Sequence, residues 1–367
     1  MKVIIAGGGT AGHINPALTI ADLLVKNLNM NKSDIMFIGT KRGLEKDLVP
    51  RADYDIKFIN VKGLNKKISF DTIKGLFSLL IGMIQSRKII KDFKPNIVIG
   101  TGGYVSGPVL YWASKFKVPT FIHESNAYPG ITTKILAKKI DICAISFEES
   151  KEHLKDCKKI ILTGNPLRDD ILDLDRKTCR DDLKMEKNEK LVVVMGGSLG
   201  ALSINNAMVE LINKHYKEND FRLIYAPGKQ YYNEVINNIY SDFKGVEIKE
   251  YIYNSPQVYN SADLIVARGG SMTISEIMAI GIPSILIPSS NVAENHQENN
   301  ARAIEKHGAC EVLLDSQING EVLYNKIMGI IGNNKKSSIM KKNSYQIGIR
   351  DGKRRIIKIL KEMMEEK

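Results

Sequence analysis

The chain has 367 residues, 43% hydrophobic and 26% charged, which is ordinary for a globular protein and long enough for two domains. No apolar stretch approaches the roughly 18 residues of a membrane span, and the N-terminal run leads into glycines, unlike a signal peptide. The net charge of +12 is uneven, because residues 1–167 hold 25 Lys and Arg against 14 Asp and Glu, whereas 168–367 hold 28 against 27. The basic half predicts an anionic partner, either nucleic acid or a membrane surface, unless it is a solvated lysine-rich face.

The first half of the chain alternates short β-branched runs with longer amphipathic stretches. The runs that predict strands are Val3–Ala6, Ile35–Ile38, Ile56–Val61, Ile97–Ile99, Thr120–His123 and Ile142–Ala144. The stretches that predict helices are Pro16–Leu28, Phe70–Phe93, Pro108–Phe116 and Ile131–Ala137. This alternation predicts βαβ units around a parallel sheet.

The pattern stops near Gly164-Asn165-Pro166, a turn signal, and then begins again. The second set of predicted strands is Leu191–Met195, Phe221–Ala226, Val246–Glu250, Leu264–Ala267 and Ser284–Ile287. Near the C-terminus, Ile356, Ile359, Leu360 and Met363 recur at helical spacing and form one apolar face. We therefore expect two Rossmann-like α/β domains, residues 1–165 and 166–345, with a C-terminal helix about 346–367 joined to the first.

The four cysteines, Cys143, Cys157, Cys179 and Cys310, form no CxxC pair and have no histidine at ligand spacing. We expect reduced thiols, with no disulfide framework and no metal site. The segment 53–55 has the DxD pattern of metal-dependent glycosyltransferases. It lies away from the glycine-rich turns described next, and we expect it on the surface.

Four glycine-rich turns follow predicted strands: 7–12, 100–104, 196–200 and 267–271. The first satisfies GxGxxG, where glycine permits close approach of a ligand and the helix-start amides favour anionic oxygens. A nicotinamide site would also need an acidic residue where the second strand ends, but that strand ends Ile38-Gly39-Thr40. Four turns at the carboxyl ends of strands predict one cleft, lined from both domains, that binds a phosphate-bearing ligand.

The chain carries the blocks GGGTAGHINPA, GTGGYVSGP, HESNAYPG, GNPLR, GGSLGA, RGGSMTISE and HQENNA in this order. With these blocks it resembles the bacterial UDP-N-acetylglucosamine:N-acetylmuramyl-(pentapeptide) pyrophosphoryl-undecaprenol N-acetylglucosamine transferases of glycosyltransferase family 28. These are peripheral GT-B enzymes, with two Rossmann-like domains facing a central cleft, that make lipid II on the cytoplasmic face of the cell membrane. The resemblance implies transfer of GlcNAc from UDP-GlcNAc to the muramyl sugar of lipid I, with inversion, in peptidoglycan synthesis, and it implies no cofactor.

The resemblance also implies a donor site, mainly in the second domain. Ser198 would bind the diphosphate, Arg168 would lie near the nucleotide, and Ile252 would offer its backbone to uracil. Glu276 would take both ribose hydroxyls, because a carboxylate accepts two hydrogen bonds at once. The remaining donor contacts would come from Ser271, Met272 and Thr273 at the phosphates and sugar, and from Gln297 at the GlcNAc hydroxyls.

In the first domain, the resemblance implies that Thr10, Ala11 and Gly12 close over the donor and that Asn126 reaches the sugar. His13, directly after the last glycine, is a candidate general base because an unperturbed imidazole titrates near neutral pH. Glu124, in another loop of the same domain, is the rival base or a carboxylate that orients a neighbour. The sequence leaves the two alternatives open.

Lysines and large apolar residues are mixed in the stretch 66–81, with Tyr111-Trp112 and Lys134 in the same half of the chain. An apolar patch with a basic rim suits an anionic inner-membrane surface, although residues 76–84 could equally form a core helix. Nucleic acid is disfavoured, because no recognition motif accompanies the charge.

Two other functions share the predicted fold. A glycolipid synthase would use a diacylglycerol acceptor, but HESNAYPG and GGYVSGP resemble acceptor-side loops of the muramyl enzymes. A non-catalytic nucleotide-sugar-binding subunit would have no need of a base such as His13.

Overall fold

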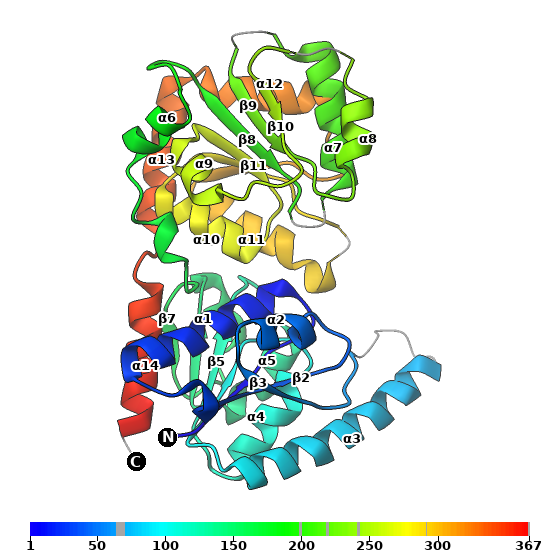
Figure 1. Cartoon of the computed structure of the whole chain (residues 1–367), viewed down its shortest axis with the longest axis vertical. Helices are drawn as coiled ribbons and strands as arrows, with labels where there is room; N and C mark the ends of the chain where they lie inside the picture. Colours follow the sequence, from blue (N-terminus) through cyan, green and yellow to red (C-terminus); the bar gives the residue numbers. More distant parts are fainter. Residues whose placement is uncertain (64–69, 198–199, 218–219, 241–242, 291, 366–367) are drawn as a thin grey trace. The chain divides into compact units, whose positions relative to one another are not determined.

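The computed structural model describes residues 1–63, 70–197, 200–217, 220–240, 243–290 and 292–365. The chain divides into two compact units (Figure 1). The N-terminal unit is Met1–Pro166 with Asp351–Lys367, and the C-terminal unit is Leu167–Arg350.

The N-terminal unit is built on a parallel seven-stranded sheet in the order β3-β2-β1-β4-β5-β6-β7. The central strands are fully buried, as expected for a parallel sheet covered on both faces. The strands are β1 (Val3–Ala6), β2 (Ile35–Gly39), β3 (Asp55–Phe58), β4 (Ile97–Gly100), β5 (Thr120–Glu124), β6 (Ile142–Ile145) and β7 (Ile160–Leu162).

Helices cover both faces of this sheet. The residues of β1 point alternately to the two faces. Val3 and Ile5 pack with α1 and α14, whereas Ile4 and Ala6 pack with α3 and α4, because successive side chains of a strand point to opposite faces. The helices of this unit are α1 (Ala11–Leu28), α2 (Glu45–Arg51), α3 (Phe70–Phe93), α4 (Ser106–Lys115), α5 (Ile131–Leu136) and α14 (Gly352–Glu365). The predicted apolar face of α14 is confirmed, since its four residues are buried in this core.

The C-terminal unit repeats the design with a parallel six-stranded sheet in the order β10-β9-β8-β11-β12-β13. Its strands are β8 (Leu191–Met195), β9 (Arg222–Ala226), β10 (Val246–Ile248), β11 (Leu264–Ala267), β12 (Ser284–Leu286) and β13 (Cys310–Val312). Its helices are α6 (Arg176–Asp182), α7 (Leu202–Glu210), α8 (Tyr232–Asn237), α9 (Ser255–Ser261), α10 (Ser271–Ile280), α11 (His296–Glu305), α12 (Gly320–Ile331) and α13 (Asn334–Ile347). Two parallel sheets with helices on them confirm the predicted α/β, doubly wound class.

Two short strands, β7 and β13, and the seven-residue helix α2 were not predicted. β7 is an edge strand of only three half-buried residues, so its apolar run is too short to indicate a strand in the sequence. The predicted third strand is too long, since β3 ends at Phe58. Asp53 and Asp55 of the DxD segment are exposed, as predicted.

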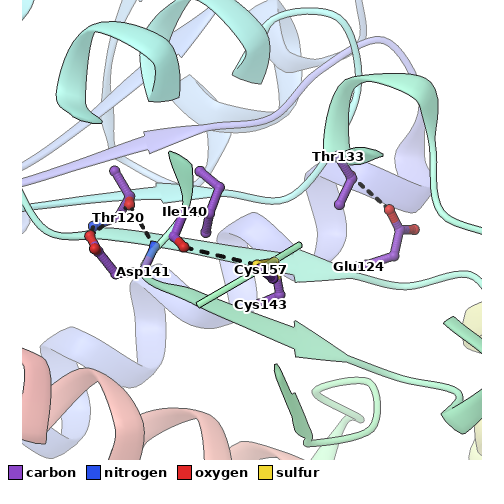
Figure 2. Close-up of a disulfide and its surroundings, with 7 residues drawn as sticks. All are labelled: Thr120, Glu124, Thr133, Ile140, Asp141, Cys143 and Cys157. Carbon is purple, nitrogen blue, oxygen red and sulfur yellow. Dashed lines mark hydrogen bonds between the residues drawn. A yellow bond between two sulfur atoms is a disulfide. The ribbon is translucent and has the colours of Figure 1, made fainter. Parts of the chain in front are cut away.

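The expectation that all four thiols are reduced is wrong for one pair. Cys143 on β6 and Cys157, in the segment before β7, form a disulfide (Figure 2). The two lie 14 residues apart and are brought together by the pairing of β6 with β7, which no local spacing motif reveals. Cys179 and Cys310 are free and buried, and burial raises the pKa of both thiols.

Candidate functional site

The glycine turns lie at the point where each sheet reverses its strand order. In the N-terminal unit, turn 7–12 follows β1 and turn 100–104 follows the adjacent β4. In the C-terminal unit, the turns after β8 and β11 are likewise neighbours. Open α/β sheets bind ligands in the crevice beyond the carboxyl ends of the strands at this reversal. Each unit therefore has one candidate ligand crevice.

His13 lies in the first turn of α1 and is held by Thr101 from the turn after β4. The Thr101 hydroxyl donates to the His13 carbonyl at 2.8 Å, and the His13 Nδ1 lies 3.0 Å from the Thr101 carbonyl oxygen. A carbonyl oxygen only accepts, so Nδ1 carries the hydrogen in this contact. In the neutral ring, Nε2 then keeps its lone pair, which is the state that a general base requires.

Glycine is necessary beside this histidine. A Cβ on Gly102 would lie 2.6 Å from the His13 Nδ1, and a Cβ on Gly103 would lie 2.5 Å from the carbonyl oxygen of Gly8. Both residues also adopt positive φ, 101° and 78°, which side chains rarely tolerate. The turn after β4 thus packs directly on the turn after β1 and fixes the imidazole.

Thr10, Ala11 and Gly12 lie where the first turn meets α1. Thr10 is the exposed N-cap residue and Ala11 is the first residue of the helix. The first backbone N–H groups of a helix have no partner within it and favour anionic oxygens. The structure brings these three residues next to His13, as their place in the sequence requires.

Glu124, the rival base, ends β5 and is almost completely buried. One carboxylate oxygen accepts from both the backbone N–H and the side-chain amide of Asn126, each at 3.1 Å. The other accepts from the Gly130 N–H at 3.2 Å and from the Thr133 hydroxyl at 2.8 Å (Figure 2). Because four donors bind this carboxylate, it shapes loop 124–130 and orients the Asn126 side chain.

The neighbouring His123 was not singled out from the sequence. It is fully buried, and burial lowers the pKa of its imidazole, which keeps the ring neutral. Its Nε2 lies 3.2 Å from the Gly164 carbonyl oxygen and 3.3 Å from the Ser146 hydroxyl. His123 therefore ties β5 to the end of the first unit and is enclosed in the core.

In the C-terminal unit, Glu276 on α10 and Arg168 lie together. The Arg168 Nε is 3.6 Å from a Glu276 carboxylate oxygen, and its Nη2 donates to the Ser255 hydroxyl at 3.1 Å. Burial raises the pKa of Glu276 to about 7, although the Arg168 charge acts in the opposite direction. The arginine is about half exposed, so it does not cancel the loss of hydration.

Ser271, Met272 and Thr273 form the first turn of α10, with Gly270 as N-cap. This turn directly follows the glycines after β11, so its amides lie at the predicted crevice. Ile252 lies after β10, at the outer edge of the same sheet, and is buried between exposed tyrosines at 251 and 253.

Gln297 lies in the first turn of α11, and its side-chain oxygen accepts from the Ser289 N–H at 2.9 Å. Its backbone carbonyl contacts Gly269 so closely that a Cβ there would overlap it. Gln297 is therefore beside the turn after β11. Ser198 lies outside the described residues.

Arg268 belongs to the RGGSMTISE block, but its guanidinium binds other residues of the C-terminal unit. It donates to Asp315 at 2.6 Å, to the Ser203 hydroxyl at 3.0 Å and to the Ile287 carbonyl at 3.1 Å. Because Ser203 also donates to Asp315, the three side chains form a closed network between α7, β11 and the segment after β13. No local sequence pattern indicates this partner, because Asp315 is 47 residues away along the chain.

Within the described ranges, no group of three or more His, Cys, Asp or Glu side chains is arranged to hold a metal ion.

We predict that the Glu276 carboxyl titrates near pH 7, which 13C NMR of labelled protein measures, with Glu276→Gln to assign the signal. Folding raises this pKa from its ordinary 4.5, so the fold favours the protonated form. That contribution to stability is complete below about pH 4.5 and is lost as the pH rises through about 7. Glu234→Gln changes an exposed carboxylate of the same unit and is the control. A carboxyl at Glu276 that titrates near 4.5 contradicts the prediction.

Comparison with known proteins agrees with the resemblance. The glycosyltransferase family 28 N-terminal domain matches residues 3–145, and the C-terminal domain of that family matches residues 191–358. The UDP-N-acetylglucosamine--N-acetylmuramyl-(pentapeptide) pyrophosphoryl-undecaprenol N-acetylglucosamine transferase of Acetivibrio thermocellus is 47% identical, over 100% of this chain and 99% of its own. The protein of the same name from Ruminiclostridium cellulolyticum is 42% identical, over 99% of this chain and all of its own.

Among solved structures, MurG of Acinetobacter baumannii superimposes with a TM-score of 0.81 at 22% identity, covering 98% of this chain and 99% of that one. This likeness confirms the predicted GT-B fold class. With both family domains matched in order and relatives above 40% identity along the whole chain, the protein belongs to glycosyltransferase family 28.

Proposed function

We propose that this protein transfers GlcNAc from UDP-GlcNAc to the muramyl sugar of undecaprenyl-pyrophosphoryl-MurNAc-pentapeptide, lipid I, and so makes lipid II for peptidoglycan. The observation that carries the proposal is the whole-chain identity to transferases of that name, together with His13 held in the tautomer that a base requires. The reaction is a single displacement at the anomeric carbon, which inverts the α-linked donor and forms a β-1,4 bond.

On the donor side, Glu276 accepts hydrogen bonds from the two ribose hydroxyls, and Arg168 beside it lies near the nucleotide. A carboxylate between a cation and a sugar can accept from both hydroxyls at once. Ile252 offers its backbone to uracil, and Gln297 contacts the GlcNAc hydroxyls. These roles follow from motif position and from the neighbourhood of Arg168 and Glu276.

The diphosphate is bound at the helix starts after β8 and β11. Ser271, Met272 and Thr273 provide the α10 amides, and Ser198 adds its hydroxyl from the other turn. Amides at a helix start stabilise the negative charge that develops on the departing UDP.

On the acceptor side, the Nε2 of His13 takes the proton from the attacking muramyl hydroxyl. The Thr101 carbonyl that binds Nδ1–H stabilises the imidazolium that results, as a fixed acceptor does for other catalytic histidines. Thr10, Ala11 and Gly12 close over the donor, and Asn126 reaches the sugar. Glu124 orients Asn126, because its oxygens already accept four hydrogen bonds.

Transfer of GlcNAc to lipid I, or to a short-chain analogue, tests this proposal. We expect His13→Ala to lower kcat by about 10²- to 10⁴-fold, the usual value of a general base, while UDP binding persists. His307→Ala, an exposed histidine of the C-terminal unit, is the control and keeps wild-type kcat. Folded wild-type protein that binds UDP-GlcNAc but transfers nothing to lipid I, or that prefers diacylglycerol, overturns the proposal.

The N-terminal unit also offers a surface for the lipid that carries the acceptor. On α3, Phe77, Leu80, Ile81 and Ile84 are 44–70% exposed at positions i, i+3, i+4 and i+7, which form one stripe. The stripe contradicts the alternative of a core helix, in which these side chains would be buried. Residues 66–69 of the predicted basic rim lie outside the described residues. No described helix is both long and apolar enough to cross a membrane.

Basic groups surround the aromatic rings of Tyr111 and Trp112 on the neighbouring helix α4. Arg87 lies over the Trp112 ring at 5.3 Å, and Lys115 and Lys139 lie near the Tyr111 ring at 6.0 and 5.5 Å. Aromatic rings and lysines of this kind favour the interface of an anionic leaflet. The protein therefore acts at the cytoplasmic face of the cell membrane as a peripheral enzyme that needs no nucleic acid.

Flotation with liposomes tests this surface. We expect binding that requires anionic lipid and weakens as salt is raised, because the lysines act through screened charge. Ile84 is 70% exposed, and we expect Ile84→Glu to abolish flotation. The matched control is Ile339→Glu on α13 of the other unit, where the side chain is 50% exposed. Liposome binding that is unchanged by salt and by Ile84→Glu contradicts the proposal that the α3 stripe contacts the membrane.

A further inference from the structure

Glu45 is a buried acid that neither the motifs nor the proposed chemistry uses. It is the first residue of α2 and is 0% exposed. Buried carboxylates usually have a cation beside them. Within the described part of the chain, Glu45 has no ion pair, and hydrogen-bond donors take the place of the cation.

Its two oxygens join the loop after β2 to the glycine turn after β1. Oε2 accepts from the Gly9 N–H at 2.9 Å. Oε1 accepts from the N–H and the hydroxyl of Thr40, each at 2.9 Å. Thr40 is buried too, so its two hydrogen bonds to Oε1 are shielded from water, and the hydrogen bond from Gly9 is partly buried. Hydrogen bonds to an ionised acceptor are about twice as strong as neutral ones.

Three glycines make the space that this side chain fills. A Cβ on Gly8 would lie 2.6 Å from Oε1, and a Cβ on Gly39 would lie 2.5 Å from the Glu45 Cγ. A Cβ on Gly43 would overlap the carboxylate itself. Glycines from the turn after β1, the end of β2 and the start of α2 thus surround one carboxylate.

Gly9 is the residue that this contact controls. Its φ is +93°, which glycine alone adopts readily, and it directly precedes Thr10 and the start of α1. A flexible glycine at that point would let the turn move, and His13 would move with it. Thr101 holds the imidazole and, through its N–H, the Ala6 carbonyl, whereas the described hydrogen bond to the Gly9 N–H comes from Glu45.

We propose that Glu45 is a positioning residue for the transfer reaction: by binding the Gly9 amide, it fixes the turn that carries Thr10 to His13. The inference rests on the proposed role of His13 as base. Glu45 itself touches no substrate. Its effect reaches the reaction only through the geometry of His13, and a displacement of about 1 Å can cost about 10²-fold in rate.

Glu45→Gln separates this role from simple packing, because glutamine keeps the shape but turns an N–H₂ group toward one of the donors. We expect kcat to fall about 10- to 100-fold, with the UDP affinity unchanged, since the residues proposed to bind uracil, ribose and diphosphate belong to the C-terminal unit. The pH–rate profile should shift in its His13-dependent limb, and hydrogen exchange of residues 7–13 should accelerate. Asp47→Asn, an exposed acid on the same helix, is the matched control.

Thr40→Val is a second test, in case the Glu45→Gln protein does not fold. It removes one donor to Oε1 but leaves the Gly9 contact, and we expect a smaller fall in kcat with the same unchanged UDP affinity. If Glu45→Gln keeps wild-type kcat, or loses it only with the fold while Thr40→Val keeps wild-type kcat, the inference is overturned. Wild-type protein with no transfer to lipid I would instead overturn the proposed function.

Discussion

The structure depends on how closely the loops pack at the carboxyl ends of the two parallel sheets. A Cβ on Gly102 would meet the imidazole of His13, and one on Gly269 would overlap the backbone of Gln297. Such contacts exclude any side chain larger than hydrogen at these positions, because neither backbone nor ring can move away from it. The crevice at each strand reversal is therefore a fixed arrangement of amides and side chains.

The buried glutamates Glu45, Glu124 and Glu276 differ in which groups contact their carboxylate oxygens. Glu45 and Glu124 accept hydrogen bonds from amides and hydroxyls of the turns and helix starts around them, so they shape the backbone there. Glu276 instead has one arginine at 3.6 Å and a pKa raised to about 7, which leaves its oxygens available to a ligand. Sequence position alone could not separate these roles, because each acid stands beside a glycine-rich or polar loop.

This division supports His13 over Glu124 as the proposed base. A base needs a lone pair directed at the substrate, and the described hydrogen bonds of Glu124 all come from residues 126–133. The Nδ1 of His13 contacts Thr101, and its Nε2 would accept the proton. We therefore propose proton transfer by His13 and a loop-shaping role for Glu124.

Much of the fold could be predicted, since long buried apolar runs such as Leu191–Met195 identify central strands and glycine turns identify their carboxyl ends. The half-buried edge strand β7 could not, because its apolar run is only three residues long. The candidate site residues could be proposed from motifs, but the contacts of the folded chain could not. Arg268 with Asp315, Cys143 with Cys157, and Glu45 with Gly9 are contacts that only the folded chain creates.

The tautomer of His13 tests the central claim most directly. Protein labelled with 15N in its histidine rings, with His13→Ala to assign the signals, reports which nitrogen carries the hydrogen in the neutral ring. The Thr101 contact predicts hydrogen on Nδ1 and a free lone pair on Nε2. A neutral ring with its hydrogen on Nε2 would contradict the account, because that nitrogen could then not accept the acceptor's proton.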